Sequence, residues 1–507
     1  MPDIVLTTLN AKFIHAAFGL RYLFANLGEL QPRAVIAEFD INLRPLDITE
    51  ALLAREPKLI GFGIYIWNVE ETAEVITAIK KIRPEIKIIL GGPEVSYETE
   101  GQKIVELADH VITGEADLKF AEVCGKIFGG ETLPKIIAAE VPEFSRLALP
   151  YDFYTGADLA HRIVYVEASR GCPFTCEFCL SSLDIPVRQV PLDKFLAAMQ
   201  KLLDRGLKQF KFVDRTFNLN LLTSRALLEF FLARHQPGMF FHFEMIPDRL
   251  PAELRAVIAK FPPGSLQFEV GIQTFNPEVG ALISRRQNYE RLADNFNYLR
   301  RETRVHIHAD LIIGLPGETV ESFGAGFDRL IALGPQEIQV GILKRLRGTP
   351  IIRHDAEWQM IYNAHPPYDI LQNRLVDFTT MQQLRRFAKY WGLVGNSGNF
   401  GETLPLLWRD GSPFANFFRF SNWLYAELGR TDTIALVRLA EKIFEFLTGE
   451  LKIEPRLAAE KLWLDWQRGG HRDPPEKIRS HLPAEKTSRA RPEKTSLPKR
   501  QARHLAV

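Results

Sequence analysis

The chain has 507 residues, 46% of them hydrophobic and 25% charged, and a formal net charge of +1. This length exceeds one ordinary hydrophobic core, so we expect a globular protein of several domains. Because Met1-Pro2-Asp3 carries no basic segment and no apolar run reaches about 20 residues, the sequence predicts a cytoplasmic protein without a signal peptide or a membrane partner.

The charge is unevenly distributed along the chain. Residues 471–507 hold ten Lys/Arg against four acidic residues, a net charge of +6, which leaves −5 for the remainder. This segment is rich in Pro, Ser and Lys, which predicts a disordered basic tail. A basic tail can contact nucleic acid, but the acidic remainder opposes a broad phosphate footprint. A solvated tail is therefore the preferred interpretation, and nucleic acid is not expected as a partner.

The first part of the chain alternates short β-branched runs with helical stretches such as Ala73–Ile82. The expected strands are Ile4–Thr8, Val35–Phe39, Leu59–Ile64, Ile86–Leu90 and His110–Thr113. This alternation predicts an α/β domain over residues 1–132 with a parallel, doubly wound, Rossmann-like sheet. Residues 133–160 contain several prolines and little periodicity, so we expect a linker there.

A second strand–helix series follows over residues 161–350. Its expected strands are Ile163–Glu167, Gln209–Val213, Phe240–Met245, Ser265–Val270, Arg304–Leu311 and Glu337–Ile342. Six strands with intervening helices predict a partial (β/α)6 barrel. Residues 351–470 instead carry aromatic-rich helical stretches, Leu375–Trp391 and Phe414–Leu428, which predict a mainly helical C-terminal domain with a packed core.

Three of the four cysteines, Cys172, Cys176 and Cys179, lie within eight residues directly after the first barrel strand. This spacing suits metal ligation better than a disulfide framework. Thiolates are the standard ligands of iron–sulfur clusters, and three of them leave the fourth iron of a cubane open, whereas a closed zinc site needs four ligands. Cys124 has no CxxC partner and lies in the helical stretch Phe120–Phe128, so we interpret it as a buried thiol.

The pattern Cys-x3-Cys-x2-Cys, with Phe178 before the last cysteine, resembles the radical S-adenosylmethionine (radical SAM) superfamily. The resemblance implies a [4Fe–4S] cluster held by the three cysteines. It also implies that the amine and carboxylate of S-adenosylmethionine chelate the open iron. An electron from the cluster then splits the C5′–S bond and yields a 5′-deoxyadenosyl radical.

Downstream motifs resemble the branch of this superfamily related to oxygen-independent coproporphyrinogen oxidase. They are Glu269-Val-Gly-Ile-Gln273-Thr-Phe-Asn276, Ile283-Ser-Arg285-Arg-Gln287, His308-Ala-Asp-Leu-Ile312-Ile-Gly-Leu-Pro-Gly-Glu318 and Lys344-Arg-Leu-Arg-Gly-Thr-Pro350. The resemblance implies that Glu244, Gln273 and Arg285 contact the ribose and methionine portions of the cofactor, and that Ile312 packs by its adenine. The family's glycine-rich stretch after the second strand is replaced by Val213–Phe217, where Asp214 is the candidate acceptor of the methionine ammonium.

The first domain resembles the cobalamin-binding domain that precedes the barrel in one large class of these enzymes. Its signals follow three consecutive strands, and the candidate cofactor-binding residues among them are Gly63, Tyr65, Trp67, Gly91, Gly92, Gly114 and Glu115. Ligands of open α/β sheets bind at the carboxyl ends of strands, where glycines admit a bulky nucleotide tail. The Asp-x-His-x-x-Gly motif that supplies a lower axial histidine is absent. We do not expect His15 to bind cobalt; Tyr65, Trp67, another group or no group occupies that face.

The sequence thus predicts an enzyme that methylates an unactivated carbon of a small-molecule or peptide substrate, with a reductase such as flavodoxin or ferredoxin as its electron donor. A cobalamin-dependent rearrangement or cyclisation is the alternative enzymatic interpretation. A tRNA-modifying factor that uses the basic tail and a noncatalytic cobalamin or redox sensor are the alternatives from other classes. Dinucleotide chemistry is not expected, because no Gly-x-Gly-x-x-Gly follows the first strand.

Overall fold

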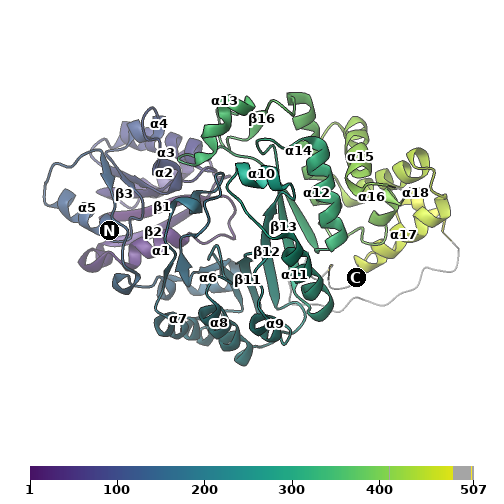
Figure 1. The fold of residues 1–507 in the computed structure, drawn as a ribbon. Coiled ribbons are helices and arrows are strands. Elements are labelled where there is room, and N and C mark those ends of the chain that lie inside the picture. The colour runs from purple at the N-terminus through teal and green to yellow at the C-terminus, as the bar shows by residue number, and fades with distance from the viewer. Residues whose placement is uncertain (410, 483–503, 505–507) are drawn as a thin grey trace. The chain divides into compact units, whose positions relative to one another are not determined.

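The computed structural model describes residues 1–409, 411–482 and 504, and we limit the description to them. The chain folds into two compact units (Figure 1). The first comprises Met1–Arg215, Lys344–Ile352 and Asn363–Asp369, and the second comprises Thr216–Leu343, Arg353–Tyr362 and Ile370–Val507. Each unit is described by itself.

The first unit begins with a parallel sheet in the order β2-β1-β3-β4-β5-β6. Its strands are β1 (Ile4–Asn10), β2 (Ala34–Asp40), β3 (Leu59–Gly63), β4 (Lys87–Gly91), β5 (His110–Thr113) and β6 (Ile136–Ala138). In the register, Val5 lies opposite Val35 and Leu6 lies opposite Gly61. The five predicted strands are confirmed. The sixth, β6, pairs with β5 inside the segment expected to be a linker, because two isoleucines suffice for a short edge strand.

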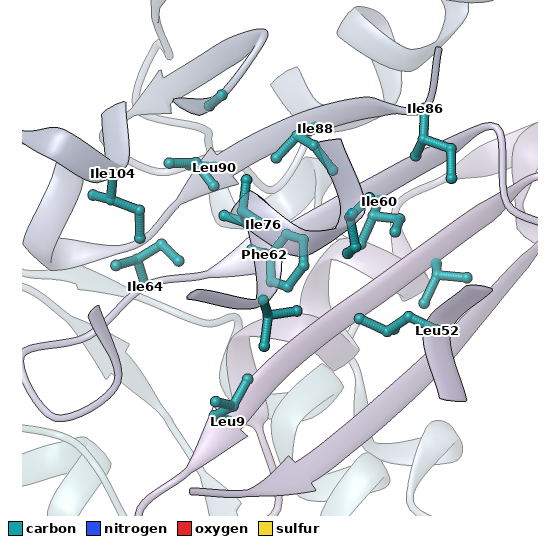
Figure 2. Close-up of a cluster of buried hydrophobic side chains, with 14 of the residues drawn as sticks. Leu9, Leu52, Ile60, Phe62, Ile64, Ile76, Ile86, Ile88, Leu90 and Ile104 are labelled. Carbon is teal, nitrogen blue, oxygen red and sulfur yellow. The ribbon is translucent and has the colours of Figure 1, made fainter. Parts of the chain in front are cut away.

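Helices cover both faces of this sheet: α1 (Phe18–Ala25), α2 (Pro45–Leu53), α3 (Val69–Ile82), α4 (Lys103–Leu107) and α5 (Lys119–Phe128). Because side chains alternate along a strand, β1 supplies Val5 to one core layer and Leu6 to the other. Figure 2 shows the first layer, where Ile60 and Leu90 pack with side chains of α2, α3 and α4. The second layer packs against α1 and α5. The doubly wound architecture is confirmed.

The first unit continues with α6 (Gly156–His161), β7 (Val164–Val166), β8 (Ser169–Arg170), β9 (Arg188–Gln189), α7 (Leu192–Asp204) and β10 (Gln209–Phe212). Strands β7 and β10 pair in parallel, and β8 pairs antiparallel with β9. Helix α6 begins with a capping box in which Thr155 and Asp158 satisfy each other's backbone N–H groups. The segment predicted as a linker therefore ends in ordered structure.

The second unit contains the remaining barrel strands, β11 (Phe240–Met245), β12 (Leu266–Gln273), β13 (His306–Ile313) and β14 (Glu337–Ile342), paired in parallel in this order. The helices that alternate with them are α8 (Leu221–Ala233), α9 (Ala252–Ile258), α10 (Pro277–Leu282), α11 (Tyr289–Glu302) and α12 (Val320–Leu333). All six strands predicted after residue 161 are present, two of them in the first unit and four in the second.

The C-terminal region is mainly helical, as predicted. Its elements are α13 (Asp355–Trp358), β15 (Ile361–Tyr362), β16 (Ile370–Gln372), α14 (Phe378–Leu393), α15 (Pro413–Leu428), α16 (Leu436–Glu445), a π-helical turn (Phe446–Glu450), α17 (Pro455–Arg468) and α18 (Glu476–Arg479). Its core is aromatic, with the Trp391 and Phe417 ring centroids 5.0 Å apart. The predicted tail starts with α18, whose Ile478 is buried, and residues 483–503 and 505–507 lie outside the described residues. Across the described residues, no helix is both long and apolar enough to cross a membrane.

Candidate cofactor sites

The three predicted cluster ligands lie on one loop of the first unit, between β8 and β9. These strands close the base of the loop, with Ser169 opposite Gln189 and Arg170 opposite Arg188. Cys176 is buried, and Cys172 and Cys179 are partly exposed. The loop therefore presents its thiols from a hairpin held at both ends.

The backbone around the first cysteine is tightly constrained. Gly171 has φ +87°, and a Cβ at this position would lie 2.6 Å from the carbonyl oxygen of Asp184. The same carbonyl accepts the Cys172 N–H at 3.0 Å, and the Cys176 carbonyl accepts the Cys179 N–H at 3.1 Å. Only glycine adopts such a conformation without strain and leaves room for that carbonyl.

The three thiols suit an iron–sulfur cluster. Thiolates are the standard ligands of such clusters, and in a cubane each thiolate binds a different iron. Among the described residues, no three His, Cys, Asp or Glu side chains lie so as to hold one metal ion. The fourth cysteine stands apart: Cys124 belongs to α5 and packs into the core of the first sheet, and burial raises the pKa of its thiol to about 12. It is the buried thiol that the sequence predicted.

Asp214 follows β10 and supports the start of the cluster loop. Its carboxylate is buried and accepts the Ala168 N–H at 3.0 Å and the Ser169 hydroxyl at 2.6 Å. Burial raises the pKa of this carboxyl to about 7. In this structure Asp214 positions the connection from β7 to β8, while its contact with the methionine amine stays a prediction.

In the second unit, the predicted S-adenosylmethionine contacts gather at one edge of the sheet. Glu244, Gln273 and Ile312 lie at the carboxyl ends of the neighbouring strands β11, β12 and β13. Each is half-buried and alternates with a buried neighbour, such as Phe243 beside Glu244. Side chains of one parity share a sheet face, and the register places Glu244 and Ile312 on the same face. Gln273 follows a shift in this register, so the alternation does not place its side chain.

A bulge holds Gln273 and Arg285 near each other. The register shifts between Gly271 and Gln273, and Gln273 has φ +72°. The Arg285 guanidinium donates to the carbonyls of Gly271 and Ile272, the latter at 3.3 Å. Such backbone strain is typical of functional positions, and Arg285 stabilises it directly.

At the carboxyl edge of the first sheet lies a cavity of about 240 Å³. It is lined by Gly19, Leu20, Leu23, Gly61, Phe62, Gly63, Tyr65, Ile89, Leu90, Gly91, Gly92, Ile112, Gly114, Glu115, Ala116, Asp117, Phe120 and Arg170. Six of the seven residues predicted for cobalamin are among them. Sites for whole ligands usually measure about 300–1,000 Å³, so this cavity suits one part of a large ligand, such as a nucleotide tail.

The cavity depends on its glycines. Gly92 has φ +109°, and a Cβ there would collide with the Ile64 carbonyl. A Cβ at Gly61 would lie 2.8 Å from the Phe120 ring. A Cβ at Gly91 would meet its nearest neighbour, the Ile112 carbonyl oxygen, only at 3.7 Å. These glycines therefore leave room for a ligand to approach the backbone closely at the strand ends.

The aromatic residues and the histidine are placed differently from one another. Tyr65 lines the cavity, whereas Trp67 stacks on Tyr65 at 4.5 Å and donates its indole N–H to the Leu9 carbonyl. His15 Nδ1 shares a hydrogen bond with the Tyr165 hydroxyl, and His15 is not among the residues lining the cavity. That cobalt lacks a histidine ligand stays a prediction.

Sequence reasoning missed several parts of this cavity, three of which lie away from the predicted strand ends. The first is the α1 wall of Gly19, Leu20 and Leu23, the second is Phe120 of α5, and the third is Arg170. The helix residues look like ordinary core positions in an amphipathic pattern. Arg170 sits beside the cysteine motif, and nothing local connects it with the first sheet.

Comparison with known proteins agrees with this architecture. Residues 4–124 match the B12 binding domain, and residues 166–330 match the radical SAM superfamily. Residues 356–503 match a protein of unknown function (DUF4080). The chain therefore combines a cobalamin-binding domain with a radical SAM domain. The radical SAM domain implies a [4Fe–4S] cluster and S-adenosylmethionine, and the B12 domain implies cobalamin.

Individual relatives match more than half of the chain. The chain is 24% identical to the uncharacterized methyltransferase PH0819 of Pyrococcus horikoshii, over 61% of this chain and 71% of the relative. It is 22% identical to the cobalamin-dependent radical SAM methyltransferase TokK of Streptomyces tokunonensis, over 57% of this chain but only 47% of the relative.

Solved structures of other proteins share the fold, and two of them match most of this chain. The radical S-adenosylmethionine methyltransferase TsrM from Kitasatospora setae, solved with cobalamin and a [4Fe–4S] cluster, matches with a TM-score of 0.57 and 17% identity, over 72% of this chain and 76% of TsrM. The cobalamin-dependent S-adenosylmethionine radical enzyme OxsB matches with a TM-score of 0.60 and 14% identity, over 95% of this chain and 83% of OxsB.

Proposed function

We propose that this enzyme methylates an unactivated carbon of a small-molecule or peptide substrate. The observation that carries the proposal is the glycine-lined cavity at the strand ends, which lies in the same unit as the three-cysteine loop. Relatives named as methyltransferases, among them TokK, support methylation as the reaction.

The chain's own residues have separable tasks in this proposal. Cys172, Cys176 and Cys179 hold the cluster and leave one iron for S-adenosylmethionine. Glu244, near the end of β11, accepts hydrogen bonds from the ribose hydroxyls, and Gln273, at the end of β12, orients the methionine portion. When bound, the cluster and S-adenosylmethionine supply a hydrogen-abstracting radical, and cobalamin supplies the methyl group.

The test measures two products of S-adenosylmethionine. The protein is reconstituted anaerobically with iron, sulfide and hydroxocobalamin. It is then reduced in the presence of methyl-deuterated S-adenosylmethionine and an extract that contains small molecules and peptides. Methyl transfer predicts 5′-deoxyadenosine, S-adenosylhomocysteine and a product that carries the deuterated methyl group. The Cys172→Ala variant should form none of them. If wild-type protein forms 5′-deoxyadenosine but never S-adenosylhomocysteine, methylation is wrong and a rearrangement or cyclisation takes its place.

A further inference from the structure

Arg170 belongs to two sites at once. Its side chain lines the cavity at the strand ends of the first sheet. Its backbone forms β8, which is followed directly by Gly171 and Cys172. The wall of the cavity and the base of the cluster loop therefore share this residue, and both lie within the first unit.

The guanidinium of Arg170 is held from several sides. It forms ion pairs with Glu115 at 3.0 Å, Asp117 at 2.9 Å and Glu167 at 2.8 Å. The ring of Tyr22 lies 4.4 Å from its central carbon. Only 14% of the side chain is exposed, so these contacts are poorly screened by water. Arg170 is thus locked in one position.

Glu115 holds a second arginine of the same hairpin. Arg188, which lies opposite Arg170 in the register, donates to Glu115 at 3.1 Å and pairs with Asp184 at 2.8 Å. The Asp184 carbonyl in turn accepts the Cys172 N–H. Two cations at facing strand positions repel each other unless an anion lies between them, and Glu115 is that anion.

We propose that Arg170 and Arg188, clamped by Glu115, are positioning residues that tie the cluster loop to the wall of the cavity. Glu115 directly follows Gly114 after β5 and lines the cavity itself. A ligand that fills the cavity fixes Glu115, and Glu115 fixes both strands of the hairpin that carries the cysteines. The sequence separation between Glu115 and Arg188 is 73 residues, so no local rule places them together.

The proposal has a measurable consequence that rests on the proposed function, namely on cobalamin filling this cavity. Coupling between two sites is reciprocal. Cobalamin binding should therefore make the cluster loop open less often, and the cluster should lose iron to a chelator more slowly. Glu115→Gln retains the size of the side chain but removes the charge that holds both arginines. In this variant, cobalamin should therefore no longer slow the loss of iron.

The experiment compares iron release in four states of the intact, reconstituted protein. Wild type and Glu115→Gln are each challenged anaerobically with a ferrous chelator, with and without bound hydroxocobalamin. We expect hydroxocobalamin to slow iron release at least threefold in wild type and to leave the rate unchanged in Glu115→Gln. The matched control is Glu122→Gln, in an exposed ion pair with Lys119 and Lys126 on α5, which should behave as wild type.

The experiment distinguishes failure of the proposed function from failure of the coupling. If wild type takes up no hydroxocobalamin, the proposed function falls and the coupling falls with it. If wild type binds hydroxocobalamin but releases iron at the same rate with and without it, the coupling alone is wrong. Should Glu115→Gln not fold, Arg188→Lys replaces it, because a lysine keeps the charge but loses the two-pronged contact with Glu115 and Asp184. Retention of the full threefold effect in that variant would overturn the proposal.

Discussion

At the scale of single residues, we predict that three of the cysteines bind the cluster and that Cys124 does not. We expect Cys172→Ala, Cys176→Ala and Cys179→Ala to lose the reconstituted cluster, because each thiolate binds its own iron. Cys124→Ala should retain close to four irons, since Cys124 is packed in the core on α5 and its raised pKa disfavours the thiolate at neutral pH. Iron analysis and the paramagnetic spectrum of the reduced cluster measure both. Loss of the cluster in Cys124→Ala would contradict the assignment.

The residues at the strand ends of the second unit should tune cofactor affinity without holding iron. Glu244→Ala and Gln273→Ala are expected to weaken S-adenosylmethionine binding by about 1–3 kcal/mol for a lost hydrogen bond to a charged or polar group. Arg285→Ala should do so as well, although it also frees the carbonyls of the bulge. Equilibrium dialysis measures affinity alongside iron content. The control is Gln339→Ala on an exposed position of β14, and equal affinity in all four variants would refute the site.

Asp214 predicts a pH dependence of stability. The pKa of its carboxyl is about 7 in the folded protein against 3.8 in a model peptide, because burial disfavours the charged form. The stability that the protonated group confers below pH 4 is therefore lost as the pH rises toward 7, by roughly 4 kcal/mol. Between pH 5 and pH 8, the midpoint of urea-induced unfolding should fall less in Asp214→Asn than in wild type.

The control for this titration is Asp109→Asn. Ion pairing with Lys80 lowers the pKa of Asp109, so this group is ionised in both states throughout that pH range. Its replacement should leave the slope of the midpoint against pH unchanged. An Asp214→Asn variant with the slope of wild type would show that other groups cause the dependence.

At the scale of elements, the carboxyl end of β4 decides whether the cavity admits a ligand. Gly91 is the better probe of its two glycines, because its φ is not positive and a Cβ there meets no atom within 3.4 Å. Gly91→Val should fill the cavity and prevent hydroxocobalamin uptake while close to four irons remain. Absorbance and iron analysis of gel-filtered protein measure this. Gly125→Ala on α5, with no neighbouring atom within 4 Å, is the control, and unchanged uptake in Gly91→Val would place the ligand elsewhere.

At the scale of the whole molecule, the basic tail should be separable from the enzyme. The truncation starts after residue 482, because Ile478 of α18 is buried and the Trp466 indole N–H donates to the Asp473 carbonyl at 2.8 Å. It also removes the contact between His504 and the Asn396 carbonyl. Removing residues 483–507 takes away seven Lys/Arg and two Glu. We expect unchanged S-adenosylmethionine cleavage, and RNA retention that is weak at 50 mM salt and absent at about 200 mM. Strong retention at both salt concentrations, lost on truncation, would indicate a nucleic-acid partner.

Local features of the sequence determined the architecture and predicted the cluster ligands. The three cysteines fall within eight residues, so their spacing alone is enough to propose the ligand set. Runs of β-branched residues predict strands such as Ile4–Asn10 and Leu59–Gly63. Glycines at Gly63, Gly91 and Gly114 mark strand ends directly. Each of these signals is contained in a short window, which is why it can be interpreted without the fold.

The tertiary structure alone decided which distant segments meet. The α1 wall of the cavity, the short strand β6 and the clamp of Glu115 on Arg170 and Arg188 join residues that lie far apart in the chain. The burial that makes Asp214 a weak acid likewise comes from packing around β7 and β10. Ion pairing and desolvation depend on the distances between atoms in the folded protein. For residues this far apart in the chain, those distances cannot be deduced from local sequence patterns.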